Sequence, residues 1–344
     1  MGIKEKGNVK KNILLALASA FITFFVLVIL YEVYQNVRYY RFKAFYRKKG
    51  DLYGNLTIAS PNEKLIWEYR PNGVCQSKRK EYKGELKGTI RTNRYGFRDY
   101  DYASPDKEEG VNRVAFIGDS VTLGLWVDFD EIFVKRFEVK ANKLSQDQKI
   151  QALNFSVDGY NTLQIHEMLK ARVLPFSPDQ VVYVMCLNDF DLHEAAASKI
   201  YYFRKPKSFF LKRIKELFHR TERPEKEDYY FFHYHRNKMK AFTKILEMRN
   251  MLNPPQIDFL VVIMPIFDFG EGFANYPYTK IHAEIKNFLS KREVRVFDLL
   301  EVFEEKIENP CDYAYDVWHP NPKGHRLMAR ALLEPVLKAE GVIP

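Results

Sequence analysis

Cysteine is scarce in this sequence of 344 residues, which contains only Cys75, Cys186 and Cys311, far apart from one another. So few scattered cysteines exclude a disulfide framework and a cysteine zinc site, and at most one bridge could form. Cys186 lies in an apolar run typical of a buried strand, so the cysteines do not indicate a redox compartment. The sequence also lacks internal repeats and low-complexity segments, and its apolar and charged fractions are those of a globular protein.

Signatures of nucleic-acid and metal binding are missing as well. The formal net charge is +10, yet the sequence has no zinc-ligand spacing, no RNA-binding strand signature and no basic zipper. His233 and His235 could suggest a metal pair, but they lie in an aromatic run without an acidic or cysteine partner in phase. We expect surface or strand positions for these two histidines. We therefore expect no nucleic-acid partner, no metal and no cofactor.

A long uncharged apolar run is present from Ile13 to Tyr31, enough for a helix that crosses the hydrocarbon core of a membrane. A cleaved signal peptide is the alternative, because Ala18-Ser19-Ala20 has the small-x-small form of a cleavage site. However, eleven more apolar or weakly polar residues follow Ala20, where the apolar run of a signal peptide should end. We therefore expect an uncleaved anchor over residues 13–31, with membrane lipid as its partner.

Basic residues flank this run on both sides, so the positive-inside rule gives no clean orientation, and their number slightly favours the second flank inside. They are Lys4, Lys6, Lys10 and Lys11 before the run and Arg38, Arg41, Lys43, Arg47, Lys48 and Lys49 after it. Aromatic residues are abundant, with 27 Phe and 22 Tyr, which suits a large core or a surface that stacks on sugar rings. We expect a single-pass protein of the inner or plasma membrane, with its main domain extracytoplasmic and facing a cell-surface glycan.

Strand and helix patterns alternate beyond residue 110, which predicts a parallel sheet covered by helices. The expected strands are residues 113–117, 150–157, 180–187, 258–264 and 294–299, and the expected helices are residues 130–144, 162–173, 236–252, 280–290 and 322–337. The predicted fold is α/β, a three-layer, flavodoxin-like arrangement with a five-stranded parallel sheet, preceded by one N-terminal transmembrane helix. The expected divisions are a basic tail (1–12), the anchor (13–31), a juxtamembrane and loop-rich lead-in (32–110) and the α/β domain (111–344).

An insertion at about residues 190–235 separates the third and fourth strands. Its front, Lys199 to Lys215, carries seven Lys or Arg among Tyr, Phe, Ile and Leu. One interpretation is a solvated excursion with a helical face. The other is a lid that lies against a membrane surface or an anionic polymer.

Polar residues follow the first three strands, where the ligands of an open α/β sheet bind. Gly118-Asp119-Ser120 ends the first strand, Asp158-Gly159 follows the second and Asn188-Asp189 follows the third. Each of these is common in turns. Asp316 and His319 stand just before the last helix, at a spacing that lets the carboxylate orient the imidazole for nucleophilic catalysis.

Together and in this order, these pieces resemble the SGNH hydrolases, also called GDSL-type esterases, over about residues 113–337. The resemblance implies that Ser120 is the nucleophile, His319 its general base and Asp316 the orienting partner of His319. It also implies an oxyanion hole formed by the N–H of Ser120, the N–H of Gly159 and the side-chain amide of Asn188. On the same resemblance, Asp119 and Asp189 are expected to hold the local turns.

Two further features bear on this resemblance. The segment from Asn93 to Arg98 resembles the Asn-x-x-Gly-Phe-Arg sequence of many bacterial membrane-anchored members. It predicts a turn with Gly96 at positive φ, Phe97 packed on the domain and Arg98 as a possible lining residue of the cleft. Cys186 replaces the glycine that usually opens the third block, and we expect the local backbone to tighten or shift while Asn188 keeps its place.

The resemblance implies a serine esterase or O-deacylase that removes an acyl group, most often acetyl, from a carbohydrate or a lipid-linked glycan. Two alternatives stay open on the sequence. An O-acyltransferase would use the same triad, with a sugar hydroxyl in place of water. A non-catalytic glycan-binding or assembly protein would keep the fold without turnover, and Cys186 is the one sequence feature in favour of it.

Overall fold

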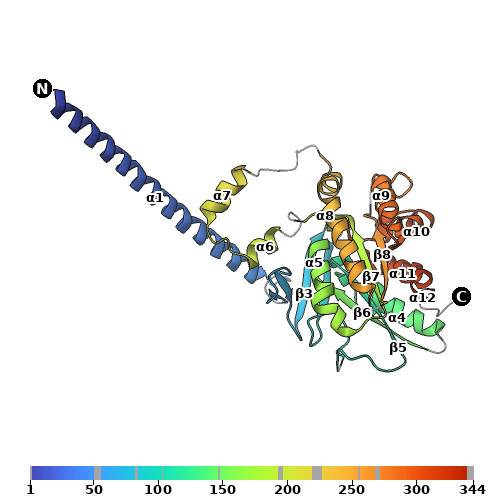
Figure 1. Cartoon of the computed structure of the whole chain (residues 1–344). Coiled ribbons are helices and arrows are strands. Elements are labelled where there is room, and N and C mark those ends of the chain that lie inside the picture. The colour runs from blue at the N-terminus through green and yellow to red at the C-terminus, as the bar shows by residue number, and fades with distance from the viewer. Residues whose placement is uncertain are drawn as a thin grey trace.

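A computed structural model describes residues 2–49, 56–81, 84–102, 104–145, 148–192, 197–218, 227–254, 256–267 and 272–338. A long N-terminal helix projects from a rounded α/β body (Figure 1). Two short helices of the insertion lie beside the part of the long helix that approaches the body. The active-site candidates all belong to the body.

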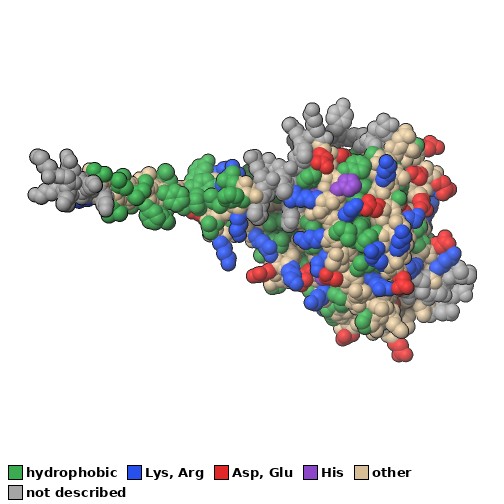
Figure 2. Space-filling model, turned by 45° about the horizontal axis from the view of Figure 1, so that its top comes forward, with side chains coloured by type: hydrophobic (Ala, Val, Ile, Leu, Met, Phe, Trp, Pro, Cys, Tyr) green, Lys and Arg blue, Asp and Glu red, His purple; other side chains and the backbone are tan. Residues whose placement is uncertain are grey.

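The long helix is α1 (Gly2–Lys49), and its stretch Lys11–Arg47 is long and apolar enough to cross a membrane. The most apolar window of this stretch has no buried residues, and Leu14, Phe21 and Ile22 are each more than half exposed. Figure 2 shows apolar side chains around the projecting helix. Exposed apolar surface of this extent is unfavourable in water, so α1 is a candidate membrane span. The helix extends well beyond the expected anchor at residues 13–31.

A five-stranded sheet forms the centre of the body, and all of its strands run parallel. Its strands are β5 (Val111–Gly118), β6 (Lys149–Ser156), β7 (Gln180–Cys186), β8 (Asp258–Met264) and β9 (Arg295–Asp298), in the order β6-β5-β7-β8-β9. Every residue of β7 is buried, as its unbroken apolar run requires. The predicted α/β fold and its strand order of flavodoxin type are confirmed.

Helices cover both faces of this sheet, which makes three layers (Figure 1). One layer contains α4 (Phe133–Leu144), α10 (Leu299–Lys306), α11 (Pro322–Ala331) and α12 (Leu333–Leu337). The other contains α5 (Thr162–Met168), α8 (Tyr229–Leu252) and α9 (Thr279–Ser290), with Phe242 of α8 stacked on Phe288 of α9. Asn321 caps α11 by accepting from the N–H groups of Lys323 and Gly324, as its place before Pro322 predicts.

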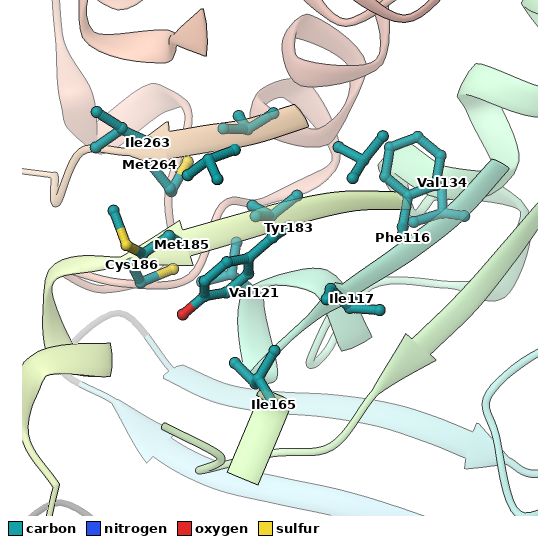
Figure 3. Packing of buried hydrophobic residues seen from close by; sticks show 14 of the residues in the cluster. Phe116, Ile117, Val121, Val134, Ile165, Tyr183, Met185, Cys186, Ile263 and Met264 are labelled. Carbon is teal, nitrogen blue, oxygen red and sulfur yellow. The ribbon is translucent and has the colours of Figure 1, made fainter. Parts of the chain in front are cut away.

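The core lies between the sheet and these helices. Figure 3 shows Phe116 and Ile117 of β5 near Val134 of α4 and Ile165 of α5, with Cys186 at the end of β7. All five side chains are buried to 3% exposure or less. Side chains pack on both faces of β5 and β7, and this packing keeps the ends of the two strands rigid. The polar residues that follow these strands therefore have fixed positions.

The lead-in contains more strand than the sequence indicates. It forms two antiparallel pairs, β1 (Thr57–Ala59) with β2 (Trp67–Tyr69), and β3 (Val74–Glu81) with β4 (Gly84–Arg91). Trp67, Tyr69 and Ile90 are fully buried in the same core as the main sheet. The lead-in is therefore a packed part of the α/β body. Strands of three residues give too short a pattern to be predicted from sequence.

The insertion forms α6 (Ala197–Phe203) and α7 (Phe209–Phe218), and both contact α1. Tyr39 of α1 donates a hydrogen bond from its hydroxyl to the carbonyl of Tyr202, at 2.9 Å. Glu32 of α1 accepts from the N–H groups of Phe209 and Phe210, at 3.1 and 2.9 Å, and so caps the start of α7. The insertion is thus tied to the candidate membrane span.

Candidate active site

Ser120 is the first residue of α3 (Ser120–Leu123), a single turn that begins where β5 ends. Asp119 caps this turn by accepting from the N–H of Val121, at 2.9 Å. A side chain at Gly118 would lie 2.2 Å from the hydroxyl of Thr122 and 3.0 Å from the carbonyl of Val184. The Gly-Asp-Ser sequence is therefore required by space and by capping, and it presents Ser120 at the carboxyl edge of the sheet.

Ser120, His319 and Asp316 form a continuous chain of hydrogen bonds. His319 Nε2 lies 2.9 Å from Ser120 Oγ, and His319 Nδ1 lies 2.8 and 2.9 Å from the two carboxylate oxygens of Asp316. The carboxylate therefore holds the ring proton on Nδ1, which leaves Nε2 as the acceptor for the serine hydroxyl. The structure brings together the three residues that the sequence predicts as a triad.

Asp316 is kept ionised by its surroundings. Burial disfavours its charge, but the hydrogen bond and charge of His319 and the N–H groups of Trp318 and His319 outweigh burial and lower the pKa of Asp316 below its usual value. The two N–H bonds measure 2.9 and 2.8 Å and close a tight turn between Asp316 and His319. Local sequence therefore sets the geometry of this pair.

Trp126 packs against the side of His319, a contact that no sequence pattern predicts. Its ring meets the imidazole edge to face with centroids 4.9 Å apart. Its backbone is in the left-handed region, with φ of 60°, which is uncommon for a bulky residue. A side chain at Gly88 of β4 would lie 2.7 Å from Trp126 Cα, so the lead-in packs directly on this strained position.

Arg98 lies below the site and does not line the cleft as predicted. It is buried at 1% exposure, and its guanidinium donates to the carbonyls of Leu123, Gly124 and Val127. These carbonyls lie at the end of α3 and directly after Trp126. Burial lowers the pKa of Arg98 to about 10. Gly96 has a positive φ of 78° and Phe97 is buried, both as predicted.

The three predicted oxyanion donors follow three adjacent strands. Ser120 follows β5, Gly159 stands in the loop after β6 with φ of 77°, and Asn188 stands in the turn after β7. The amide of Asn188 donates to Asp119 Oδ2 at 2.9 Å, which fixes the Asn188 side chain beside the turn that begins at Ser120. An amide carries two N–H groups, so this bond leaves the other N–H for a further acceptor.

Cys186 fits the place of the usual glycine without backbone strain. Its φ of −102° and ψ of 159° are ordinary extended values. Its sulfur lies 3.7 Å from Asp119 Oδ1, and burial, followed by the charges of Asp119 and Asp189, raises the pKa of the thiol well above its usual value. Asp189 accepts from the hydroxyl of Tyr183 and the N–H of Cys186, so it holds the turn as expected.

The two histidines of the aromatic run, His233 and His235, both lie on α8. His233 is buried on α8 with Nδ1 3.6 Å from Asp191, so the predicted surface or strand position is wrong for it, whereas His235 is exposed on the same helix. The helix was missed at this point because its aromatic start resembles a strand. His193 lies outside the described residues. Among the residues that the structure describes, no group of three or more His, Cys, Asp or Glu side chains could hold a metal ion.

Comparison with known proteins gives a family match over most of the α/β body. The model of the GDSL-like lipase/acylhydrolase family matches residues 116–327. No curated protein gives a significant match.

Three of the solved structures that match this chain are the following. A GDSL-like lipase from Bacteroides thetaiotaomicron is 16% identical over 66% of this chain and 89% of its own, with a TM-score of 0.41. A psychrotrophic esterase from Pseudoalteromonas sp. is 15% identical over 67% and 99%, with a TM-score of 0.42. An acetylxylan esterase from Geobacillus stearothermophilus is 16% identical over 65% and 93%, with a TM-score of 0.43.

Proposed function

This chain belongs to the GDSL-like lipase/acylhydrolase family and is a serine hydrolase of ester bonds, and we propose that it works through an acyl-enzyme on Ser120. The observation that carries the proposal is the hydrogen-bonded chain from Ser120 through His319 to Asp316. A serine hydroxyl is a poor nucleophile until a neighbouring base accepts its proton. His319 Nε2 is placed to accept it.

The proposed reaction has two half-reactions. His319 takes the proton of Ser120 as Oγ attacks the ester carbonyl carbon, and the same imidazole then gives this proton to the departing alkoxide. Water, deprotonated by His319, next attacks the acyl-enzyme, and the proton returns to Ser120 as the carboxylic acid leaves. The ionised Asp316 stabilises the imidazolium in both halves, and the N–H groups of Ser120 and Gly159 with the amide of Asn188 receive the oxyanion.

We further propose a small acyl group, acetyl, as the substrate group. Ser120 and His319 are exposed by only 7% and 8%, which favours a narrow approach to the nucleophile. For the alcohol part we propose a carbohydrate or lipid-linked glycan at the extracytoplasmic membrane surface, because the body is attached to α1, the candidate membrane span. Under this proposal, the rate constant kcat/KM on p-nitrophenyl esters falls by roughly tenfold or more from acetate to decanoate. Equal or better turnover of decanoate would contradict a site built for acetyl.

The catalytic proposal is tested with p-nitrophenyl acetate and the full chain in detergent. Ser120→Ala is expected to lower kcat at least about a thousandfold. Ser290→Ala serves as the matched control, because Ser290 is exposed at the end of α9. The proposal would be overturned if Ser120→Ala were as active as Ser290→Ala. It would also be overturned if the wild-type protein were as inactive as Ser120→Ala.

A further inference from the structure

Lys199 of the insertion is buried against the loop that follows β6. It is exposed by only 3%, although α6 belongs to a segment rich in solvated lysine and arginine. Its Nζ donates to the carbonyl oxygen of Asp158 at 2.6 Å and pairs with the Asp158 carboxylate. The same ammonium lies over the ring of Trp67, 5.4 Å from its centroid. Burial of a lysine with this many contacts calls for a specific role, because an ammonium loses its hydration there.

The carbonyl that Lys199 contacts belongs to the same peptide unit as the N–H of Gly159. In a trans peptide the C=O and N–H groups point in opposite directions. An ammonium fixed on the Asp158 oxygen therefore fixes the direction of the Gly159 N–H on the other side of the unit. The cation also draws electron density from the amide, which makes the N–H a stronger donor.

The neighbourhood of Gly159 leaves Lys199 little freedom. A Cβ built on Gly159 would lie 3.3 Å from Lys199 Nζ, and the φ of 77° already disfavours any other residue. Burial raises the pKa of Asp119, and the nearby charge of Asp158 adds a smaller effect in the same direction. A negative charge so near the nucleophile turn would also oppose an oxyanion, and Lys199 neutralises it.

We propose that Lys199 is a positioning residue of the oxyanion hole: it orients and strengthens the Gly159 N–H and neutralises Asp158 beside the developing oxyanion. This inference rests on the proposed function, because it takes Gly159 as an oxyanion donor. It assigns the insertion a part in catalysis that differs from both a solvated excursion and a membrane-facing lid. Lys199 touches the loop and acts through it, so its effect falls on the transition state and not on substrate binding.

The test compares Lys199→Met, Lys199→Arg and the matched control Lys207→Met, whose lysine is exposed on the same insertion. With p-nitrophenyl acetate and the full chain in detergent, Lys199→Met is expected to lower kcat roughly ten- to a hundredfold, with little change in KM. Lys199→Arg should recover most of the rate, because a guanidinium can make both contacts. Lys207→Met should match wild type.

A second readout reports on the oxyanion hole itself. Methylboronic acid forms a tetrahedral adduct on a catalytic serine, and its inhibition constant should rise in Lys199→Met by about the same factor as kcat/KM falls. If Lys199→Met fails to fold because the partly buried Asp158 has lost its cation, the double variant Asp158→Asn/Lys199→Met removes that negative charge. The double variant should fold and still show the lower kcat, because the peptide unit has lost its cation.

The outcomes separate this inference from the proposed function. Suppose that the wild-type rate depends on Ser120. If Lys199→Met or the double variant then folds and keeps the kcat and the boronate affinity of wild type, the role of Lys199 alone is overturned. An equal loss in Lys207→Met also overturns it. An inert wild-type protein, or one indifferent to Ser120→Ala, removes the proposed function and this inference with it.

Discussion

Asp316 determines which nitrogen of His319 carries the proton, and this is the most exact requirement of the triad. In Asp316→Asn the amide oxygen can still accept the N–H bonds of the turn, but the side chain can now donate to Nδ1. The ring would then hold its proton on Nε2 and could not accept from Ser120. We expect kcat to fall by about ten-thousandfold with little change in KM.

The control for this variant is Asp312→Asn, whose side chain is exposed on the same C-terminal segment. Steady-state kinetics on p-nitrophenyl acetate give kcat and KM for both variants and so test whether Asp316 orients His319. A change confined to KM, or a kcat within tenfold of wild type, would show that Asp316 does not orient the base.

His325 makes the stability of the protein depend on pH. It is fully buried, its Nδ1 accepts from the N–H of Phe133, and burial, then the charges of Arg98 and His319, lowers its pKa from 6.5 to about 3. Below pH 6.5 the unfolded chain takes up a proton at this position and the folded chain does not. The free energy of unfolding should therefore fall as the pH falls from about 6.5 towards 3, by up to about 1.4 kcal/mol per pH unit from this group.

Denaturant unfolding in detergent between pH 7 and pH 4 measures this slope. His325→Asn keeps an acceptor for Phe133 but has no proton to gain, so its slope should be shallower than that of wild type. Identical slopes for the two proteins would refute a buried neutral His325.

Some of these residues could be predicted from the sequence and others could not, for physical reasons. Asp316 and His319 are three residues apart, so local turn geometry determines their contact. Lys199, Trp126 and Arg98 reach the site only because the insertion and the lead-in fold back onto it. No local pattern predicts such long-range contacts, and the sequence does not distinguish a buried lysine from an exposed one.

Arg98 is the residue through which the lead-in supports the nucleophile turn. Its guanidinium donates hydrogen bonds to the carbonyls at the end of α3 and to the carbonyl directly after Trp126. Arg98→Met would remove the buried guanidinium from the carbonyls of Leu123 and Val127, whereas the carbonyl of Gly124 would keep the N–H of Val127. We expect a loss of about 3 kcal/mol or more in the free energy of unfolding, together with reduced kcat.

Arg94→Met is the matched control, because Arg94 pairs with Asp101 on the surface, where the two side chains are 49% and 48% exposed. Such a pair is worth less than about 1 kcal/mol. Denaturant unfolding compares the two variants. A stability of Arg98→Met equal to that of Arg94→Met would contradict a structural role for the guanidinium.

Elements with long, strongly patterned sequences were predictable and short ones were not. The unbroken apolar run of β7 and the capped start of α11 fixed their assignment. The strands β1 and β2 have three residues each, and their burial depends on packing against the main body. Helix α8 begins earlier than predicted, because its first residues are aromatic and favour strands in isolation.

The molecule as a whole joins a candidate membrane span to an esterase body through the insertion. Tyr39 of α1 holds α6, and α6 carries Lys199 to the loop of Gly159. Basic side chains gather where the projecting helix meets the body (Figure 2). If α1 spans a membrane, this arrangement would keep the site near the membrane surface, on the side that the orientation of α1 selects.

Cysteine labelling measures that orientation. Cys75 and Cys186 are buried and Cys311 is partly exposed, so Cys311 is the thiol open to a reagent in the folded protein. If the body is extracytoplasmic, a membrane-impermeant maleimide should label wild type in intact spheroplasts and should not label Cys311→Ser. Labelling that requires lysis would place the body in the cytoplasm and exclude a surface glycan as substrate.

An acyl-enzyme on Ser120 is the step on which the proposed mechanism depends most directly. Mixing the full chain with p-nitrophenyl acetate, quenching in acid during the first turnover and sequencing the peptides by mass spectrometry would locate the acetyl group. The expected result is one acetyl group on Ser120, absent from Ser120→Ala. Ester cleavage that leaves Ser120 unmodified, or an acetyl group transferred to another residue with the same kinetics, would contradict the mechanism.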